Sequence, residues 1–210
     1  LVVDLVSRRL PKSYGYDPLR DIQVITPAKQ GPLGTRELNR LLQGKLNPPE
    51  RGKGEATLMG RTLREGDKVM QIRNNYDIIW QQPDGTAGTG IFNGDMGIIE
   101  MLDPGSKTIQ VRFEEKLATY SFENQDQLEH AYAVTVHKSQ GSEFEAVVMP
   151  LERRHPKLHY RNLLYTAVTR ARKLLIMTGQ KETVYAMVQN NRRTLRYTNQ
   201  KEMLQEMCDE

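Results

Sequence analysis

Hydrophobic and polar positions follow two patterns along this chain. Toward both ends, apolar residues recur at helical spacing or gather in short continuous runs. In the middle, short β-like runs alternate with turn signals rich in Gly, Asn, Asp and Pro. The outer pattern is typical of an α/β domain, and the middle pattern predicts a small β-barrel or meander.

The first block predicts a helix, a strand and a second helix. Apolar spacing over Leu1–Leu10 predicts the first helix, which Pro11 is expected to end. The run Ile22–Thr26 predicts a strand, and a loop with two glycines follows it. Thr35 is the expected cap of the second helix. The expected buried face of that helix carries Leu38, Leu41, Leu42 and Leu46.

The last block places many polar groups on one loop. Val134–Val136 and Ala146–Met149 predict strands, and the loop between them carries His137, Lys138, Ser139, Gln140 and Glu143. Because ligands dock at the carboxyl ends of strands in open α/β sheets, this loop is the first candidate site. Beyond it, the pattern predicts a helix over 162–171, a strand over 174–177 and a helix over 181–189.

Composition limits the function classes. The chain has 210 residues, a formal net charge of +4, which permits a nucleic-acid partner, and one cysteine, Cys208. That single cysteine excludes a disulfide framework, and no metal site is expected because the histidines form no zinc pattern. No apolar run suits a membrane span, so a cytoplasmic location is expected. The start at Leu1, inside an apolar run, leads us to expect a longer parent chain.

Three segments resemble motifs of superfamily 1 helicases. Residues 133–149 and Tyr165–Arg172 resemble motifs V and VI of the second RecA-like domain, and Thr26–Gly34 resembles motif IV of the RecD-like branch. The three occur in the family's order. Segments of the middle block are similar to an SH3-like barrel, called 2B, that RecD-like helicases insert here: Gly66–Gln71, Asn74–Tyr76 and Asn93–Asp95.

The resemblance implies an α/β fold: a RecA-like, P-loop-NTPase-type parallel sheet that lacks the P-loop, with an inserted small SH3-like β-barrel. Residues 1–62 and 128–210 would form the two parts of RecA-like domain 2A, and residues 63–127 the barrel. The implied function is that of the C-terminal motor domain of an ATP-dependent 5′-3′ DNA helicase acting on single-stranded DNA in DNA repair and recombination. Subunits of a nuclease complex, such as exodeoxyribonuclease V, are further implied partners.

The same resemblance implies a nucleotide site. Arg170 would be the arginine finger that stabilises charge on the γ-phosphate, and Glu143 would accept hydrogen bonds from the ribose. Gln140, Gly141 and Lys29 complete the implied nucleotide-binding set. The simpler alternatives are a helix-surface Arg170, a helix-terminal acid at Glu143 and a solvated or DNA-facing Lys29.

A second set of residues is implied to contact DNA. The resemblance assigns Thr135, His137 and Ser139 to the DNA backbone, without base reading. Asn74 and Asn75 are candidate contacts to single-stranded DNA, and the tyrosine that follows them offers a stacking face. The alternatives are a plain surface histidine and a tyrosine in the barrel core.

A complete motor needs a phosphate loop, Gly-x-x-x-x-Gly-Lys-[Ser/Thr]. Neither Gly44-Lys45 nor Gly52-Lys53 is followed by Ser or Thr. ATP with Mg²⁺ is therefore expected to be held mainly by an N-terminal RecA-like domain of the same parent chain, and the chain alone is expected to be inactive as an ATPase. The alternatives are the helicase part of a conjugative relaxase and a non-catalytic nucleic-acid-binding module.

Overall fold

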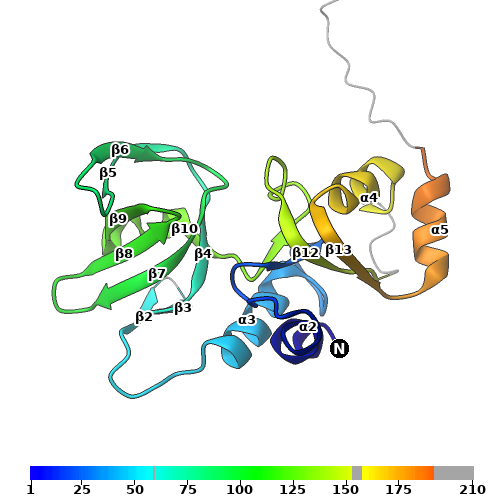
Figure 1. The fold of residues 1–210 in the computed structure, drawn as a ribbon, viewed down its shortest axis with the longest axis horizontal. Helices are drawn as coiled ribbons and strands as arrows, with labels where there is room; N and C mark the ends of the chain where they lie inside the picture. Colours follow the sequence, from blue (N-terminus) through cyan, green and yellow to red (C-terminus); the bar gives the residue numbers. More distant parts are fainter. Residues whose placement is uncertain (59, 153–157, 192–210) are drawn as a thin grey trace, which may run out of the picture.

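A parallel sheet forms the centre of one half of the molecule (Figure 1). The computed structural model describes residues 1–58, 60–152 and 158–191; the predicted tail and part of the basic loop after Leu151 lie outside these ranges. The strand order is β11-β1-β12-β13, and all neighbouring strands are parallel. The strands are β1 (Ile22–Thr26), β11 (Ala133–Thr135), β12 (Phe144–Pro150) and β13 (Ala171–Thr178).

Helices cover both faces of this sheet. The N-terminal helix and α3 (Thr35–Leu46) pack against one face, on side chains such as Val24 and Val148. The helices α4 (Arg161–Val168) and α5 (Lys181–Gln189) pack against the other, on Val147 and Met149. Since successive strand residues point to opposite faces, each strand contributes to two cores. This three-layer arrangement confirms the predicted α/β fold class.

The N-terminal helix does not end at Pro11, contrary to the prediction. It consists of α1 (Val2–Asp4), a π-helical segment η1 (Leu5–Arg9) and α2 (Leu10–Tyr14), and Gly15 with φ 71° ends it. In η1 the Leu10 N–H donates to the Leu5 carbonyl, one residue further back than in an α-helix. This wider turn directly before Pro11 accommodates a residue without an N–H. Within the described ranges, no helix has the length and apolar character to cross a bilayer.

The other half is a seven-stranded antiparallel barrel sheet, in the order β10-β4-β7-β8-β9-β5-β6. Ile99, Val111 and Tyr120 are fully buried in its core. Its strands are β4 (Lys68–Gln71), β5 (Asn75–Gln81), β6 (Ala87–Ile91), β7 (Met96–Asp103), β8 (Thr108–Phe113), β9 (Lys116–Ser121) and β10 (Leu128–His130). The hairpin β2 (Glu55–Leu58) and β3 (Arg61–Arg64) precedes it, and the 3-10 helix η2 (Phe122–Gln127) precedes β10.

The chain passes from the barrel back to the parallel sheet over a very short distance. His130 still pairs with β4, and Ala133 already pairs with β1. The barrel is therefore inserted between α3 and β11 of one continuous α/β unit. The domain limits at residues 62/63 and 127/128 stay predictions.

Three local predictions need correction. The N-cap of α3 is Gly34 rather than Thr35. Leu41, predicted for the buried face of α3, is 39% exposed, while Asn39 and Gln43 are buried. Ala171 belongs to β13 rather than to the preceding helix.

Candidate nucleotide and nucleic-acid sites

The loop of residues 136–143 crosses the parallel sheet from its carboxyl edge, where the strands end, to its amino edge, where the strands begin. It begins after Thr135, which pairs with Thr26 at the carboxyl ends of β11 and β1. It ends before Phe144, at the amino end of β12. The prediction that the whole loop lies at the carboxyl ends of strands is therefore wrong for Glu143, which directly precedes β12.

Arg170 lies at this amino edge, in the turn between α4 and β13. Its Nη1 donates to the Ser142 carbonyl at 3.0 Å, its Nε to the Thr166 carbonyl at 3.1 Å and its Nη2 to Thr169 Oγ1 at 3.2 Å. The predicted helix does not include Arg170, because α4 ends at Val168. A guanidinium has five N–H donors, so two of them have no partner among the described residues.

Glu143 lies on the same side of the sheet as this guanidinium, because it directly follows Ser142, whose carbonyl accepts from Arg170. Its Oε2 accepts from Arg172 Nε at 3.1 Å. Gly141 has φ +87°, and a Cβ there would meet no atom within 4 Å, so this side of the loop is open. Donors with unused capacity, a carboxylate and an open glycine turn fit a phosphate with its ribose.

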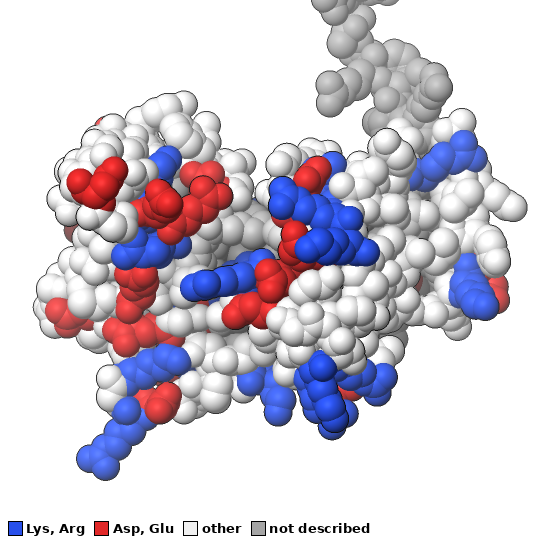
Figure 2. Space-filling model, in the orientation of Figure 1, with Lys and Arg blue, Asp and Glu red and all other residues white. Residues whose placement is uncertain are grey.

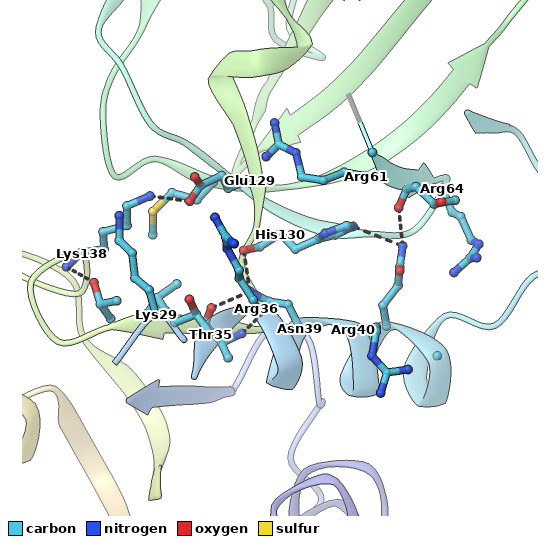
Figure 3. Close-up of a pocket in the computed structure, with 18 of the residues that line it drawn as sticks. Lys29, Thr35, Arg36, Asn39, Arg40, Arg61, Arg64, Glu129, His130 and Lys138 are labelled. Atoms are coloured by element: carbon cyan, nitrogen blue, oxygen red, sulfur yellow. Dashed lines mark hydrogen bonds and ion pairs between the residues drawn. The ribbon is translucent and has the colours of Figure 1, made fainter. Parts of the chain in front are cut away.

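A pocket of about 890 Å³ lies at the carboxyl edge, between α3, the β2–β3 hairpin and the strands β10 and β11 (Figure 3). Figure 3 shows Lys29 and Arg36 extending from the α3 side toward Glu129 on the opposite wall. Lys29 thus lies with Thr135 in this pocket, rather than with Glu143 and Arg170. Among the described residues of the lining, Glu129 is the one acid, and the cations are Lys29, Arg36, Arg40, Arg61, Arg64 and Lys138.

The cations of this pocket differ in how far they are neutralised. Lys138 Nζ lies 2.6 Å from Glu129 Oε2, and Arg40 and Arg64 pair with carboxylates just outside the lining. Lys29 and Arg36 are exposed and form no ion pair within the described part of the chain. Burial alone would raise the pKa of Glu129, but Lys138, Arg61 and Lys29 hold that pKa below its usual value. The pocket therefore keeps a net positive charge.

The predicted contacts on the loop after β11 lie at different depths. Thr135 is buried, and its Oγ1 accepts from the Lys138 N–H at 3.4 Å. His137 and Gln140 are exposed. Ser139 is fully buried, and its hydroxyl donates to the Val136 carbonyl at 2.8 Å, so its side chain shapes the loop from inside.

Asn74 and Asn75 lie on the barrel, at the start of β5. The exposed Asn74 accepts the Asn93 N–H at 2.9 Å through Oδ1. The half-buried Asn75 donates from Nδ2 to Gln127 Oε1 at 3.0 Å and accepts the Asp77 N–H at 2.9 Å. The amide of Asn75 is therefore used within the barrel, whereas Asn74 keeps its own amide hydrogens toward solvent.

Sequence reasoning missed the cations that α3 and β3 add to the pocket. Arg36, Asn39, Arg40 and Gln43 recur at helical spacing and form the polar face of α3, opposite its leucines. That periodicity was a signal for a polar wall. No comparable signal marked Arg61, which reaches the pocket through the hairpin and donates to the Leu128 carbonyl at 2.8 Å.

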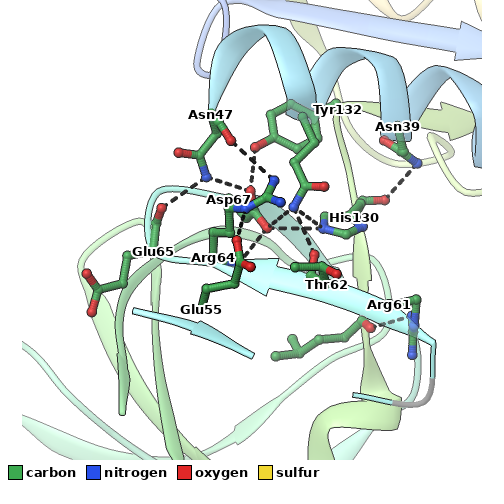
Figure 4. A network of polar contacts seen from close by, with 12 residues as sticks. Asn39, Asn47, Glu55, Arg61, Thr62, Arg64, Glu65, Asp67, His130 and Tyr132 are labelled. Carbon is green, nitrogen blue, oxygen red and sulfur yellow. Dashed lines mark hydrogen bonds and ion pairs between the residues drawn. The ribbon is translucent and has the colours of Figure 1, made fainter. Parts of the chain in front are cut away.

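A buried carboxylate fixes the two walls of the pocket to each other (Figure 4). Asp67 is fully buried in the turn between β3 and β4. Its Oδ1 accepts from Asn47 Nδ2 at 2.6 Å and from the Tyr132 hydroxyl at 2.8 Å. Its Oδ2 accepts from Gln43 Nε2 at 2.7 Å, the Arg64 N–H at 2.9 Å and His130 Nε2 at 3.1 Å. One side chain thus joins α3, the hairpin and β10.

Over residues 1–58, 60–152 and 158–191, no group of three or more His, Cys, Asp or Glu side chains is placed to hold a metal ion.

Family models match two parts of the chain. The model described as "ATP-dependent RecD-like DNA helicase SH3 domain" matches residues 38–113, which include the barrel strands β4 to β8. The model described as "UvrD-like helicase C-terminal domain" matches residues 130–178, which include β11, β12, α4 and β13. The two matches correspond to the two halves of the structure.

Whole proteins match this chain in sequence, and a solved structure shares its fold. The ATP-dependent RecD2 DNA helicase of Deinococcus radiodurans is 35% identical over 158 residues, 75% of this chain and 20% of that protein. RecBCD enzyme subunit RecD of Buchnera aphidicola is 26% identical over 172 residues, 80% of this chain and 26% of that protein. The fold is shared with a Bacteroides Pif1 helicase solved with ADP-AlF3 and ssDNA (TM-score 0.51, 16% identity, 99% of this chain and 49% of that chain). The chain, which spans about a quarter or less of these two relatives, belongs to the RecD-like family of superfamily 1 helicases.

Proposed function

We propose that this chain is the second motor domain of an ATP-dependent DNA helicase. It grips the backbone of single-stranded DNA in the basic pocket and presents Arg170 to ATP held mainly by another RecA-like domain of the same parent. The observation that carries this proposal is the pocket, with six cations and one acid at the carboxyl edge of the sheet. The Pif1 relative solved with ssDNA and the helicase names of the curated relatives support the same function.

The pocket suits a phosphodiester backbone because part of its positive charge is exposed and forms no ion pair among the described residues. Lys29 and Arg36 form no ion pair within the described residues, so binding a phosphate breaks no existing pair. Neutralising phosphates releases counterions, which makes such binding strong at low salt and independent of base sequence. Exposed His137 lies on the adjoining loop and can add a contact.

At the amino edge, Arg170 and Glu143 would meet the nucleotide. The guanidinium has two N–H donors that no described residue uses, and these could stabilise charge on a transferring phosphoryl group. Mg²⁺ would be held mainly by the other RecA-like domain, with the triphosphate. Movement in the 5′-3′ direction and assembly with nuclease subunits, suggested by the RecBCD name of one relative, belong to the same proposal.

The salt dependence of DNA binding tests the grip. Fluorescence anisotropy with a labelled oligothymidylate should show that Lys29→Ala/Arg36→Ala weakens binding. The slope of log K against log salt should also become shallower, by about 0.7 for each phosphate that the variant no longer neutralises. The control is Lys12→Ala/Arg20→Ala, which removes two exposed charges outside the pocket. Equal slopes for both double variants would remove the pocket from DNA binding.

A further inference from the structure

The turn that carries Arg170 is closed by the side chain of Thr169. Thr169 is the C-cap of α4 and directly precedes Arg170. Its Oγ1 lies 3.0 Å from the Tyr165 carbonyl and 3.1 Å from the Thr166 carbonyl, and it donates its one hydrogen to this pair of acceptors. Since that hydrogen is used within α4, Oγ1 meets Arg170 Nη2 at 3.2 Å as an acceptor. The helix end therefore fixes the Thr169 hydroxyl in the orientation that suits the guanidinium.

Thr166 and Thr169 hold one side of the guanidinium together. Arg170 Nε donates to the Thr166 carbonyl at 3.1 Å, and Nη2 donates to Thr169 Oγ1 at 3.2 Å. These two acceptors lie 3.1 Å apart, so the neighbouring Nε–H and Nη2–H groups of one guanidinium reach both. A third bond, from Nη1 to the Ser142 carbonyl at 3.0 Å, holds the other side. Three acceptors thus set the plane of the guanidinium.

These bonds leave one N–H on each of the terminal nitrogens of Arg170. Nη1 and Nη2 carry two hydrogens each, and each nitrogen uses one of them among the described residues. N–H groups on the two terminal nitrogens can bind two oxygens of one phosphate side by side, and this contact depends on the plane of the guanidinium. Of the three acceptors that set the plane, Thr166 and Ser142 contribute backbone carbonyls, and Thr169 contributes its side chain.

The distribution of charge on the surface makes the placement of single donors important. Figure 2 shows acidic and basic side chains interspersed over the face in view, without a continuous basic band. Near Arg170, the Arg172 Nε already donates to Glu143 Oε2 at 3.1 Å. A surface of mixed charge exerts little long-range attraction on a phosphate, so recognition depends on how individual donors are placed. The plane of the Arg170 guanidinium therefore decides how this edge meets a phosphate.

We infer that Thr169 is a positioning residue for ATP hydrolysis: its hydroxyl sets the plane of the Arg170 guanidinium, so that the two remaining N–H groups face the transferring phosphoryl group. The inference rests on the proposed function, because it needs Arg170 to act on a nucleotide held by another RecA-like domain. Thr169 acts through Arg170 and does not itself touch the nucleotide. Since charge develops on the phosphoryl group in the transition state, the loss of this hydroxyl should affect kcat more than KM.

The experiment measures DNA-stimulated ATP hydrolysis by a parent chain that holds both motor domains. Thr169→Val keeps the shape of the side chain and removes the hydroxyl. It is expected to lower kcat about 10- to 100-fold and to leave the KM for ATP within about twofold of the wild type. Thr169→Ser retains the hydroxyl and should restore most of kcat. The control is Thr183→Val, the same exchange on α5, where the buried hydroxyl has no hydrogen-bond partner among the described residues.

A double substitution separates positioning from a structural role. In an Arg170→Ala background, Thr169→Val should have no further effect on kcat, because its effect passes through the guanidinium. A further loss of similar size in that background would overturn the inference, and so would a wild-type kcat for Thr169→Val beside a strong loss for Arg170→Ala. Unchanged turnover in Arg170→Ala would instead refute the finger role in the proposed function, and this inference with it. Thermal unfolding of each variant identifies any loss of fold, and Thr169→Ala supplies a second substitution without the hydroxyl.

Discussion

Asp67→Asn is the substitution with the most definite consequence for this fold. The wild-type carboxylate is fully buried and accepts five hydrogen bonds. Asparagine has the same shape but only one acceptor oxygen. If the NH₂ group takes the place of Oδ1, it faces the donors of Asn47 and Tyr132. If it takes the place of Oδ2, it faces the donors of Gln43, Arg64 and His130. The variant therefore introduces donor–donor contacts at a position closed to bulk solvent.

The size of the effect follows from the number of hydrogen bonds that the variant cannot form. A hydrogen bond to a charged acceptor contributes about 1.5–3 kcal/mol, so the absence of two lowers the free energy of unfolding by about 3–6 kcal/mol. The Tyr132 hydroxyl can turn away and recover part of this. Since small domains have a total stability of about 5–15 kcal/mol, Asp67→Asn should leave a marginally stable protein.

Urea denaturation followed by circular dichroism measures this difference. The control is Asp84→Asn, because Asp84 is an exposed turn residue that accepts one backbone N–H, from Thr86 at 2.8 Å, and asparagine can make the same bond. The control should unfold like the wild type. If Asp67→Asn also does so, the network in Figure 4 does not join the two halves.

The same residue predicts a pH dependence. Burial would raise the pKa of Asp67, but the hydrogen bond and charge of His130, with the Asn47 and Arg64 bonds, lower it below its usual value. A carboxyl group with a lowered folded pKa stabilises the protein above the unfolded pKa of about 4, and this contribution is lost as the pH falls through the folded pKa. Acid should therefore destabilise the wild type more steeply than Asp67→Asn.

Three further predictions concern single residues. Burial lowers the pKa of Lys68 to about 8, so the protein should become more stable as the pH rises from about 8 toward the unfolded pKa near 10.4. Lys68→Met should remove that rise and increase the free energy of unfolding at pH 7 by about 1–3 kcal/mol, as chemical denaturation would show. Gly44→Ala, in the last turn of α3 with no atom within 4 Å of a new Cβ, should raise the free energy of unfolding by up to about 1 kcal/mol. Gly34→Ala would instead place a Cβ 2.5 Å from the Gln30 backbone and should lower the melting temperature. In a parent that holds both motor domains, Arg170→Ala should reduce ATP turnover about 10³-fold or more with DNA affinity retained, and Arg172→Ala should have a much smaller effect; unchanged turnover would exclude the finger role.

The fold was predictable where local pattern and tertiary burial agree. Ile22–Thr26 and Lys181–Gln189 have the predicted bounds, because a β-branched run between two cores and an isolated helical stretch leave few alternatives. The strand β5 was missed, because Asn75–Gln81 has a register shift that breaks its alternation. The helix through Pro11 was missed because a π turn is not visible in composition.

The candidate sites were predictable only as separate motifs. The motifs placed Glu143 and Arg170 close together, and the structure brings them to one edge through Ser142. No sequence pattern showed that Lys29 lies at the opposite edge, because this depends on strand order and direction. The contribution of Arg61 depends on how the hairpin folds over α3, which is a tertiary contact.

The crossing loop of residues 136–143 has a mechanical consequence. This segment is folded into successive turns, and backbone hydrogen bonds link them: the Ser139 N–H donates to the Thr135 carbonyl at 3.1 Å, and the Ser142 N–H donates to the Ser139 carbonyl at 3.2 Å. A shift of Thr135 would therefore be transmitted through these bonds to Ser142, and from there to the Arg170 guanidinium that donates to its carbonyl. A flexible insertion after Gly141 should uncouple the two edges of the sheet, so that a ligand bound at one edge would no longer affect the residues at the other.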